Sequence, residues 1–455
     1  MSTPSTSRRV AARVLENLET RGGFANELLQ VLWDSTADGG LEGAHPADRA
    51  LTRELVYGVC RWRSRLDWAL NQVSDRPVEA LDVRLRTVLR LGAYQILELE
   101  RIPPWAAVNE SVNLAKTTGR GRAASFVNAV LRHLDRRQDE LARPSFDDPL
   151  EALAVGQSHP HWLVERWVAR FGHETTAAIL EANNELAPLT LRVNPLKASS
   201  EEVAAALEQD GFEVRESAVV PGVLRLEASP REVTTTEVFR SGACTVQDEG
   251  AVLVGYLAAP APGQTVLDAC AAPGGKASHL AEQMADGGAI LAMDRHAARM
   301  ERLVAQSLRL GLRSVVPFVG DGLAPPLRAP VPLVLVDAPC SGLGVLRRHP
   351  EGKWLKGPEI IERHATLQAA LLDALGPYVA GGGVLLYSVC AFEPEETTEL
   401  VARWTAGHAA WSVERPEAYL PEAAHRWVTR EGALCIVPEP GGPDGFFAVR
   451  LRRGR

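Results

Sequence analysis

The chain has 455 residues, of which 46% are hydrophobic and 23% are charged, and its formal net charge is −8. These values are typical of folded globular proteins, and the length favours about three domains. No run of about 18 apolar residues occurs, and the first residues lack the apolar core of a signal peptide. We therefore expect a cytoplasmic protein. The six cysteines form no CxxC pair and no disulfide pattern, so we expect no metal site.

The charge is unevenly distributed along the chain. Residues 1–145 hold 21 lysines and arginines against 18 carboxylates, so the negative excess lies in the remainder. Basic clusters occur at 61–65 and 116–122, and arginine side chains of this kind can hold phosphates. Solvated helix faces explain each cluster equally well. Net charge alone decides nothing about a nucleic-acid partner.

The first expected domain, residues 1–145, is helical. Apolar residues recur at helical spacing from Arg8 to about Arg137. Breakers such as Gly22-Gly23 and Pro103-Pro104 fall between the apolar segments. The pattern predicts about six or seven helices and no strand.

The second expected domain, residues 146–245, is a small α+β module of the RRM kind. A helical stretch at 162–180 leads to an alternating segment at 189–195. The next segments have the pattern of one helix and two strands, at 200–209, 212–215 and 223–226. This β-α-β-β order is typical of a compact α+β unit.

The third expected domain, residues 246–455, alternates strands and helices. Buried strands are predicted at 265–269, 289–293, 315–319, 333–337, 384–389 and 445–451. Helices are predicted between them, including 276–285, 297–310 and 365–375. Alternation of this kind predicts a Rossmann-like, doubly wound α/β sheet, with ligands at the carboxyl ends of its strands.

The first strand of this sheet runs into a loop of small residues that opens a helix. The loop consists of Cys270, Ala271, Ala272, Pro273, Gly274, Gly275 and Lys276. Small residues let a ligand approach the backbone, and the helix offers free N–H groups. Neither GxGxxG nor a P-loop is formed, which disfavours a dinucleotide and a nucleoside triphosphate.

Two carboxylates follow at the ends of the next two strands. Asp294 lies about 20 residues after the glycine turn, the position of a ribose-binding acid, and Asp321 could accept from an exocyclic amine. Each could instead be a helix N-cap, but their joint placement favours an adenosine-like ligand. With the altered glycine turn, S-adenosylmethionine is the best single candidate.

Two cysteines, Cys340 and Cys390, follow apolar strand-like runs. An isolated buried cysteine is usually a small core residue. However, a thiolate that adds to C6 of cytosine would make C5 nucleophilic, and a base must later remove the C5 proton. Lys276 and the Arg347-Arg348 pair are candidate cations that could lower a thiol pKa. Asp337, if protonated or bridged to the base at N3, could stabilise the charge that develops during addition. The residues alone do not assign the two cysteines to separate roles.

The strings around these residues carry a resemblance. Asp337-Ala338-Pro339-Cys340-Ser341, Cys390 with Pro394-Glu395-Glu396, and Cys270 to Lys276 resemble motifs of the RNA (cytosine-5) methyltransferase family. The segment Val345 to Trp354 resembles its bacterial small-subunit branch, the RsmB (Sun, Fmu) proteins. The helical N-terminus is similar to the antitermination factor NusB, as in that branch. The resemblance covers nearly the whole chain.

This resemblance implies a S-adenosylmethionine-dependent methylation of C5 of a cytosine in 16S ribosomal RNA, free or in a partly assembled small subunit. It implies that Cys390 is the nucleophile and that Cys340 assists product release. It also implies that Cys270 to Lys276, Asp294, Asp321 and Asp337 line the cofactor pocket. Two residues depart from the family pattern: Ala391 replaces the usual serine and Thr397 the usual asparagine.

Two other functions compete with this interpretation. An amine methyltransferase needs no nucleophilic cysteine, and Asp-Pro-Pro-aromatic would be expected where Asp337 to Cys340 stand. A non-catalytic RNA-binding or antitermination adaptor would use only the helical domain. The presence of both cysteines together with the carboxylates argues against the adaptor.

Overall fold

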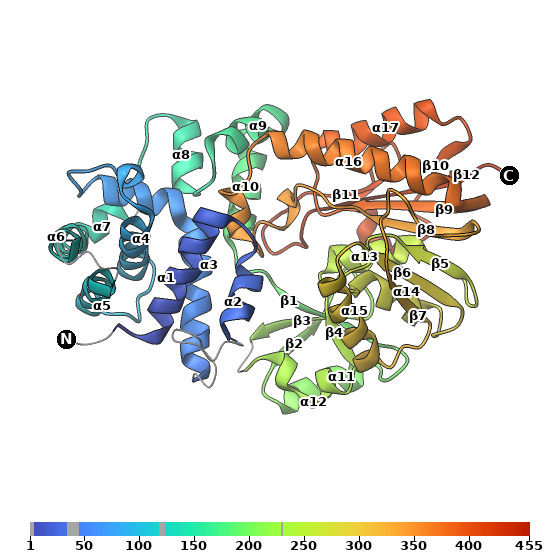
Figure 1. Ribbon diagram of the computed structural model, residues 1–455, viewed down its shortest axis with the longest axis horizontal. Coiled ribbons are helices and arrows are strands. Elements are labelled where there is room, and N and C mark those ends of the chain that lie inside the picture. The colour runs from blue at the N-terminus through green and yellow to red at the C-terminus, as the bar shows by residue number, and fades with distance from the viewer. Residues whose placement is uncertain (1–3, 34–44, 118–122, 143, 229–230) are drawn as a thin grey trace. The chain divides into compact units, whose positions relative to one another are not determined.

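The computed structural model describes residues 4–33, 45–117, 123–142, 144–228 and 231–455 (Figure 1). The chain forms two compact units. The helical unit consists of Met1–Glu185 together with Leu346–Pro358, and the sheet unit consists of Leu186–Val345 and Glu359–Arg455. Within the described ranges, no helix combines the length and apolarity needed to cross a membrane.

Helices make up the described part of the helical unit, as the periodicity predicts. Its α-helices are α1 (Thr6–Arg21), α2 (Ala25–Trp33), α3 (Pro46–Asn71), α4 (Val83–Leu97), α5 (Pro104–Thr117), α6 (Ala123–Arg136), α7 (Gln138–Leu141), α8 (Pro149–Gly156), α9 (His161–Phe171) and α10 (His173–Asn184). Local interactions fix where several of these helices begin. The Asp82 side chain accepts from the Leu85 N–H and caps α4, and proline is the first residue of α3, α5 and α8. Seven of the helices lie between Thr6 and Leu141, so the predicted all-helical fold of this part is confirmed.

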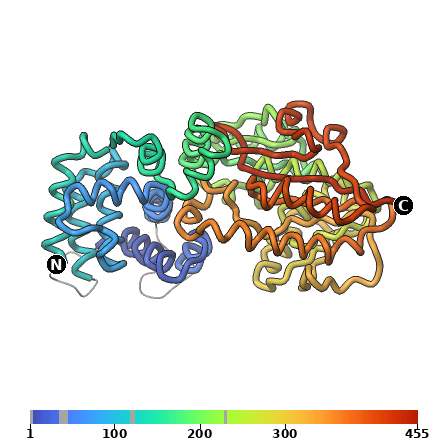
Figure 2. The backbone as a smooth tube through the Cα atoms, turned by 90° about the horizontal axis from the view of Figure 1, so that it is seen from above, coloured from blue at the N-terminus to red at the C-terminus, as the bar shows by residue number. Residues whose placement is uncertain are grey.

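The segment Leu346–Pro358 interrupts the sheet unit in sequence and belongs to the helical unit. Figure 2 shows this orange stretch of chain next to the blue helices of that unit. It contains the short 3-10 helix η4 (Pro350–Lys353). The indole N–H of Trp354 donates to the Cys60 carbonyl at 2.6 Å, and the Glu351 carboxylate accepts from the Ala25 N–H at 3.0 Å. Nothing in the local sequence predicts this docking.

The sheet unit begins with a four-stranded antiparallel sheet in the order β2-β3-β1-β4. Its elements are β1 (Leu189–Val193), α11 (Ser200–Gln209), β2 (Glu213–Glu216), β3 (Val223–Ala228), α12 (Glu237–Arg240) and β4 (Cys244–Val246). A capping box between Ser199 and Glu202 starts α11. The predicted β-α-β-β order is confirmed. The sequence analysis missed β4, whose three residues are too short to show a period.

The second sheet has eight strands. Its helices are α13 (Glu249–Ala258), α14 (Gly275–Gln283), α15 (Ala297–Leu310), α16 (Glu359–Leu375) and α17 (Thr398–Gly407). Its strands are β5 (Thr265–Asp268), β6 (Ala289–Asp294), β7 (Val315–Val319), β8 (Val331–Asp337), β9 (Val379–Val389), β10 (Trp411–Glu414), β11 (Leu434–Ile436) and β12 (Phe446–Arg453). The main order is β10-β12-β9-β8-β5-β6-β7, and β11 pairs with β12. All six predicted strands are present.

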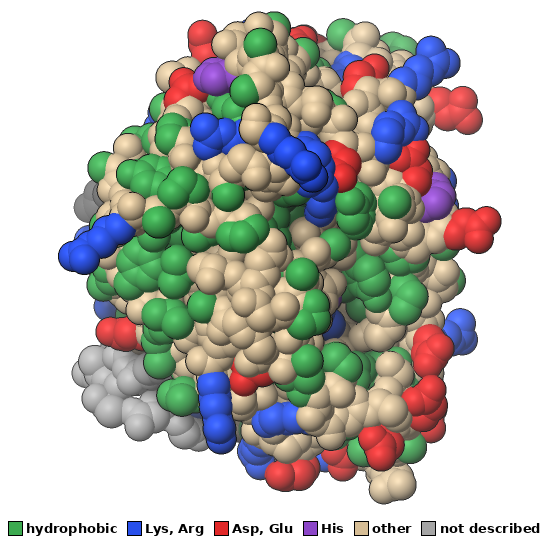
Figure 3. Space-filling model, turned by 90° about the vertical axis from the view of Figure 1, so that its right-hand side faces the viewer, with side chains coloured by type: hydrophobic (Ala, Val, Ile, Leu, Met, Phe, Trp, Pro, Cys, Tyr) green, Lys and Arg blue, Asp and Glu red, His purple; other side chains and the backbone are tan. Residues whose placement is uncertain are grey.

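The five strands from β9 to β7 are parallel, whereas β12 is antiparallel to β9. The strand order reverses between β5 and β8, so this is the switch point at which an open sheet leaves a crevice for ligands. β8 is buried along most of its length, which explains its continuous apolar sequence. The face in Figure 3 intersperses both charge signs with apolar side chains, so it carries no single-sign field.

Candidate active site

The two cysteines meet at the carboxyl ends of neighbouring parallel strands. Asp337 at the end of β8 is in register with Ser388 of β9, and Cys390 follows β9 directly. The Cys340 Sγ lies 3.3 Å from the Cys390 Sγ, and neither cysteine forms a disulfide. The hydrogen bond that the Cys340 thiol donates to Cys390, together with burial, raises the pKa of Cys340 well above its ordinary value. Cys340 therefore keeps its proton while Cys390 lies beside it.

A partly buried ion pair lies beside the two thiols. The Lys276 Nζ is 2.7 Å from one oxygen of Asp337, and the Ser388 hydroxyl donates to the other oxygen at 2.8 Å. Burial acts to lower the pKa of Lys276, but Asp337 and, more weakly, Cys390 outweigh it and hold that pKa above its ordinary value. The site thus contains a fixed cation close enough to Cys390 to interact with a thiolate.

Backbone and side-chain bonds hold the loops that carry the thiols. The buried Glu396 carboxylate accepts from the Ser341 N–H at 2.7 Å and from the Gln368 amide at 3.0 Å. The Gly344 N–H donates to the Cys390 carbonyl at 3.1 Å, which joins one loop to the other. A Cβ on Gly344 would lie 2.2 Å from the Gly445 carbonyl oxygen, so this approach requires glycine. The sequence analysis gave no role to Glu396, because its partners are distant in sequence.

Both residues that depart from the family pattern are fully buried. Ala391 packs in an apolar cluster of the large sheet. Thr397 donates its hydroxyl to the Glu393 carbonyl at 2.7 Å.

The loop from Cys270 to Lys276 connects β5 to the start of α14. The Ala271 N–H donates to the Met293 carbonyl at 2.8 Å, and the Ala272 N–H donates to Asp294 at 3.3 Å. Ala272 and Pro273 are joined by a cis peptide bond, and Pro273 is exposed. Gly274 has φ +106°, where a Cβ would press on Leu303 at 3.0 Å. α14 begins at Gly275, so the free N–H groups of the first helical turn face the loop.

A cleft of about 190 Å³ lies at these strand ends. Cys270, Asp294 and Asp321 line it, whereas Ala271 to Lys276 and Asp337 are not among its lining residues. The sequence analysis did not select the other residues around the cleft, which are Ala269, Arg295, His296, Arg299, Gly322, Leu323, Pro339, Leu367 and Leu371. Two carboxylates facing apolar walls fit a ligand with hydroxyl and amino groups on an apolar ring, as adenosine has.

Asp268, at the end of β5, is a further acid that the sequence analysis did not select. It is 1% exposed, and burial followed by the negative charge of Asp337 raises its pKa to about 8. Asp294 also contributes to this increase, while Lys276 opposes it. Asp268 is therefore mostly protonated at neutral pH, which lowers the negative charge beneath the cleft.

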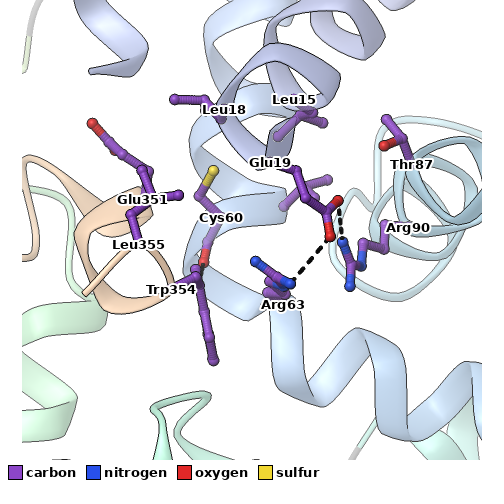
Figure 4. A pocket seen from close by; sticks show the side chains of 11 residues that line it. Leu15, Leu18, Glu19, Cys60, Arg63, Thr87, Arg90, Glu351, Trp354 and Leu355 are labelled. Atoms are coloured by element: carbon purple, nitrogen blue, oxygen red, sulfur yellow. Dashed lines mark hydrogen bonds and ion pairs between the residues drawn. The ribbon is translucent and has the colours of Figure 1, made fainter. Parts of the chain in front are cut away.

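The basic cluster at 61–65 is not a free phosphate-binding surface. Arg61 is buried, Arg63 pairs with Glu19 at 3.3 Å, and Arg65 forms an ion pair with Glu98. Figure 4 shows Glu19 bonded to Arg63 and Arg90, with Cys60 between this group and Glu351. Internal pairing explains the cluster better than either sequence-based interpretation. In the second cluster, residues 118–122 lie outside the described part of the chain.

The Arg347-Arg348 pair lies in the segment that packs in the helical unit. The Arg347 carbonyl accepts from the Arg61 guanidinium at 3.5 Å. Of the predicted cations, Lys276 is the one that the structure brings to Cys390 within the sheet unit.

Comparison with known proteins agrees with this geometry. The family model "16S rRNA methyltransferase RsmB/F" matches residues 255–452, and the "NusB family" model matches residues 5–136. A "Methyltr_RsmF/B-like, ferredoxin-like domain" model matches residues 159–234. A probable ribosomal RNA small subunit methyltransferase B of Synechocystis is 36% identical over 453 residues, covering 98% of this chain and 99% of that protein. The chain belongs to the RsmB methyltransferase family.

Further relatives support the same membership over the full length. The corresponding probable methyltransferase of Bacillus subtilis is 34% identical over 453 residues, covering 98% of both chains. The crystal structure of PH0851 has a TM-score of 0.78 at 27% identity and covers 100% of both chains. The predicted family and the methyltransferase class are confirmed. Neither the amine methyltransferase nor the adaptor fits this family.

Proposed function

We propose that this protein methylates C5 of one cytosine in 16S ribosomal RNA, with Cys390 as the nucleophile and Cys340 as the group that assists product release. The observation that carries this assignment is the asymmetry of the thiol pair. The two sulfurs are 3.3 Å apart, but the pKa of Cys340 is raised whereas Cys390 interacts with the Lys276 ammonium. The thiolate next to a cation is the nucleophile.

In the first step the Cys390 thiolate adds to C6 of the cytosine. A carbon–sulfur bond forms, the C5–C6 double bond opens, and the electron pair moves toward N3, making C5 nucleophilic. Asp337 lies in the site at which the base must enter, held by Lys276 and Ser388 at 2.7 and 2.8 Å. When it is protonated, its carboxyl can donate a hydrogen bond to N3 and stabilise the negative charge that develops there.

S-adenosylmethionine, when bound in the cleft, supplies an electrophilic methyl group to C5. We propose that Cys270, Asp294 and Asp321 contact it through the cleft lining, and that Ala271 to Gly275 hold it through the backbone. Lys276 and Asp337 would lie at the boundary between the cofactor and the base. The fit depends on the two carboxylates and the apolar walls described above.

The last step removes the C5 proton and expels Cys390. The hydrogen bond that Cys340 donates to Cys390 is the largest cause of the raised pKa of Cys340. Once Cys390 is bonded to carbon it carries no negative charge, so this cause weakens and Cys340 can lose its proton to solvent. The Cys340 thiolate then takes the C5 proton, the double bond re-forms, and Cys390 leaves as a thiolate.

A thiol cannot reach C6 of a stacked, paired cytosine, so the target base must leave its stack. Free ribosomal RNA or a partly assembled small subunit offers such a strand, and we propose one of these as the substrate. We place the reaction in the cytoplasm. The division into a helical domain at 1–145, a small module at 146–245 and a catalytic domain at 246–455 stays a prediction, in which the first two parts position the RNA.

The experiment that tests the roles compares two cysteine variants on 16S ribosomal RNA. Cys390→Ala should show no methyl transfer and no covalent RNA adduct. Cys340→Ala should accumulate a methylated protein–RNA adduct that denaturing electrophoresis resolves, because the nucleophile remains and the base is lost. Cys435→Ala, which changes a thiol outside the pair, should behave like the unchanged protein. Near-normal turnover of Cys390→Ala would overturn the assignment.

A further inference from the structure

The sheet unit contains a second cavity, separate from the cofactor cleft. It encloses about 320 Å³ between the small module and helices α13 and α14, which is at the lower end of the range for ligand cavities. Arg192 and Pro221 from the module, Tyr256 from α13, and His279 and Gln283 from α14 contribute to its wall. We call it the Tyr256 pocket. None of these residues has a part in the steps described above.

The pocket combines two rings with polar atoms that have no protein partner. The Tyr256 and His279 rings meet edge to face, with centroids 6.0 Å apart. His279 is 6% exposed, and within the described residues neither its Nδ1 nor the buried Gln283 Oε1 has a hydrogen-bond partner. A Cβ on Gly255 would lie 2.0 Å from the His279 Nδ1, so glycine makes room for this ring. The His279 Nδ1 therefore faces the α13 backbone, and a ligand in the cavity would meet the other parts of the His279 ring, the Tyr256 ring and the Gln283 side chain, which line it.

The charged side chains that line the pocket, Arg192 and Glu282, neutralise each other. The Arg192 guanidinium makes two bonds of 2.8 Å to the Glu282 carboxylate, and both side chains are at most 3% exposed. Burial, and then the charge of Arg192, lowers the pKa of His279 well below its ordinary value, so its ring is neutral at pH 7. An anion such as a phosphate would therefore find no free positive charge here. The pocket suits an uncharged, planar ring with donors and acceptors on its edge.

The pocket and the Lys276–Asp337 ion pair share helix α14. His279 follows Lys276 by three residues on α14, a rise of about 4.5 Å along the helix axis. The Arg192 guanidinium donates to the Gly275 carbonyl at 3.0 Å, so a wall of the pocket contacts the end of the cofactor loop. When the target base of an RNA strand lies at Cys390, a neighbouring nucleotide of the same RNA can extend to a pocket on α14.

We propose that the Tyr256 pocket binds an unstacked base of the substrate RNA, a few nucleotides from the target cytosine. This inference rests on the proposed function, because it assigns the ligand from the substrate of that reaction. Single-stranded RNA is commonly read by splayed bases that stack on aromatic rings and bond through their edges. Tyr256 and His279 supply the rings, and Gln283 supplies an amide that can bond to the edge of the base.

The experiment measures steady-state kinetics of the full chain with a 16S ribosomal RNA fragment that contains the target. Tyr256→Ala should raise KM for the RNA by about 5- to 150-fold, the usual range for one stacked base, with kcat and cofactor affinity unchanged. Gln283→Ala, which removes one hydrogen-bonding amide, should raise KM by about 2- to 10-fold. Tyr256→Phe, which keeps the ring and loses only the bond to the Pro221 carbonyl, should stay near the unchanged protein. The matched control is Leu308→Ala, an exposed apolar residue on α15.

A second measurement keeps the proposal testable if Tyr256→Ala folds poorly. RNA that carries 4-thiouridine should photocrosslink to peptides from Glu249–Ala258 or Gly275–Gln283, and less so in Gln283→Ala. Unchanged KM in Gln283→Ala and Tyr256→Ala, with no crosslink to either helix, would overturn the pocket assignment. Cys340→Ala would still accumulate its protein–RNA adduct in that case. The pocket assignment would then be wrong while the proposed function stood.

Discussion

Two lysines, one in each unit, are buried in opposite electrostatic settings. Lys276 lies at the strand ends beside the Asp337 carboxylate at 2.7 Å, and its pKa is above the ordinary value. Lys353, in the segment Leu346–Pro358, is 1% exposed and donates to three neutral oxygens. These are the Arg61 and Ser158 carbonyls, each at 3.3 Å, and the Asn184 side chain at 2.6 Å. Burial, and then the charge of Arg61, lowers the pKa of Lys353 well below its ordinary value.

The difference shows that neutral oxygens do not compensate for the burial of a charge, whereas a single carboxylate does. Lys276 is thereby kept as a permanent cation next to a thiol. Lys353 connects α3, the loop after α8 and the end of α10 through hydrogen bonds. We infer that the first lysine serves the chemistry and the second the packing of the helical unit.

The sharpest test of this comparison removes the charge of the catalytic lysine. Lys276→Met should lower kcat by about 10²- to 10³-fold, because the Cys390 thiolate loses its cation and Asp337 loses its partner. Lys276→Arg keeps the charge and should recover part of the loss. Single-turnover methylation measures the effect. A kcat within about threefold of the unchanged protein in Lys276→Met would contradict the role of this lysine.

The matched change in the helical unit should affect stability and leave the chemical step unchanged. Lys353→Met removes three donated hydrogen bonds and leaves their buried acceptors unsatisfied, which should cost about 1–3 kcal/mol in the free energy of unfolding. Urea unfolding followed by tryptophan fluorescence measures this loss. Lys276→Met is the control for the other unit. A large drop in single-turnover rate for folded Lys353→Met would show that the comparison is wrong.

The smallest expected effect is a difference in pH dependence. The folded pKa of Lys353 is below 10.5, so the folded state binds fewer protons than the unfolded state. The contribution of this lysine to stability therefore rises with pH, from its lowered pKa up to about 10.5. For Lys276 the folded pKa is above 10.5, so its contribution is fully present below 10.5 and is lost as the pH rises through the raised pKa.

Thermal unfolding between pH 7 and 10 tests these signs against the two methionine variants. The unfolding free energy of the unchanged protein minus that of Lys353→Met should increase with pH, by at most about 1.4 kcal/mol per pH unit. The corresponding difference for Lys276→Met should stay flat over this range. Equal slopes for the two lysines would remove the electrostatic distinction between them.

Much of the sheet unit was predictable because its signals are local. Strands such as β8 are continuous apolar runs buried between parallel neighbours, and β5 is followed at once by the glycine loop. Parallel strands bring their carboxyl ends to one edge, so Cys340, Cys390 and Asp337 could be placed together before any coordinates were known. The sequence analysis did not predict β10 and β11, which have four and three residues.

The features that could not be predicted depend on contacts between residues that are far apart in sequence. The arginines at 61–65 resemble a phosphate-binding cluster until Glu19 and Glu98 are seen to pair with them. Similarly, Glu396 follows a proline in a surface-like string, yet it is buried and holds the Ser341 N–H. A sequence gives the charge of a side chain, but only its neighbours decide whether that charge is free.

The sequence by itself determined the helical and α/β classes, the order of the elements, the cofactor loop and the pair of cysteines, since these follow from periodicity and from short contiguous motifs. The tertiary structure alone decided the distance between the two thiols, the opposite pKa shifts of Lys276 and Lys353, and the docking of Leu346–Pro358 in the helical unit. Each of these depends on dielectric environment and on long-range partners, which exist only after the chain has folded.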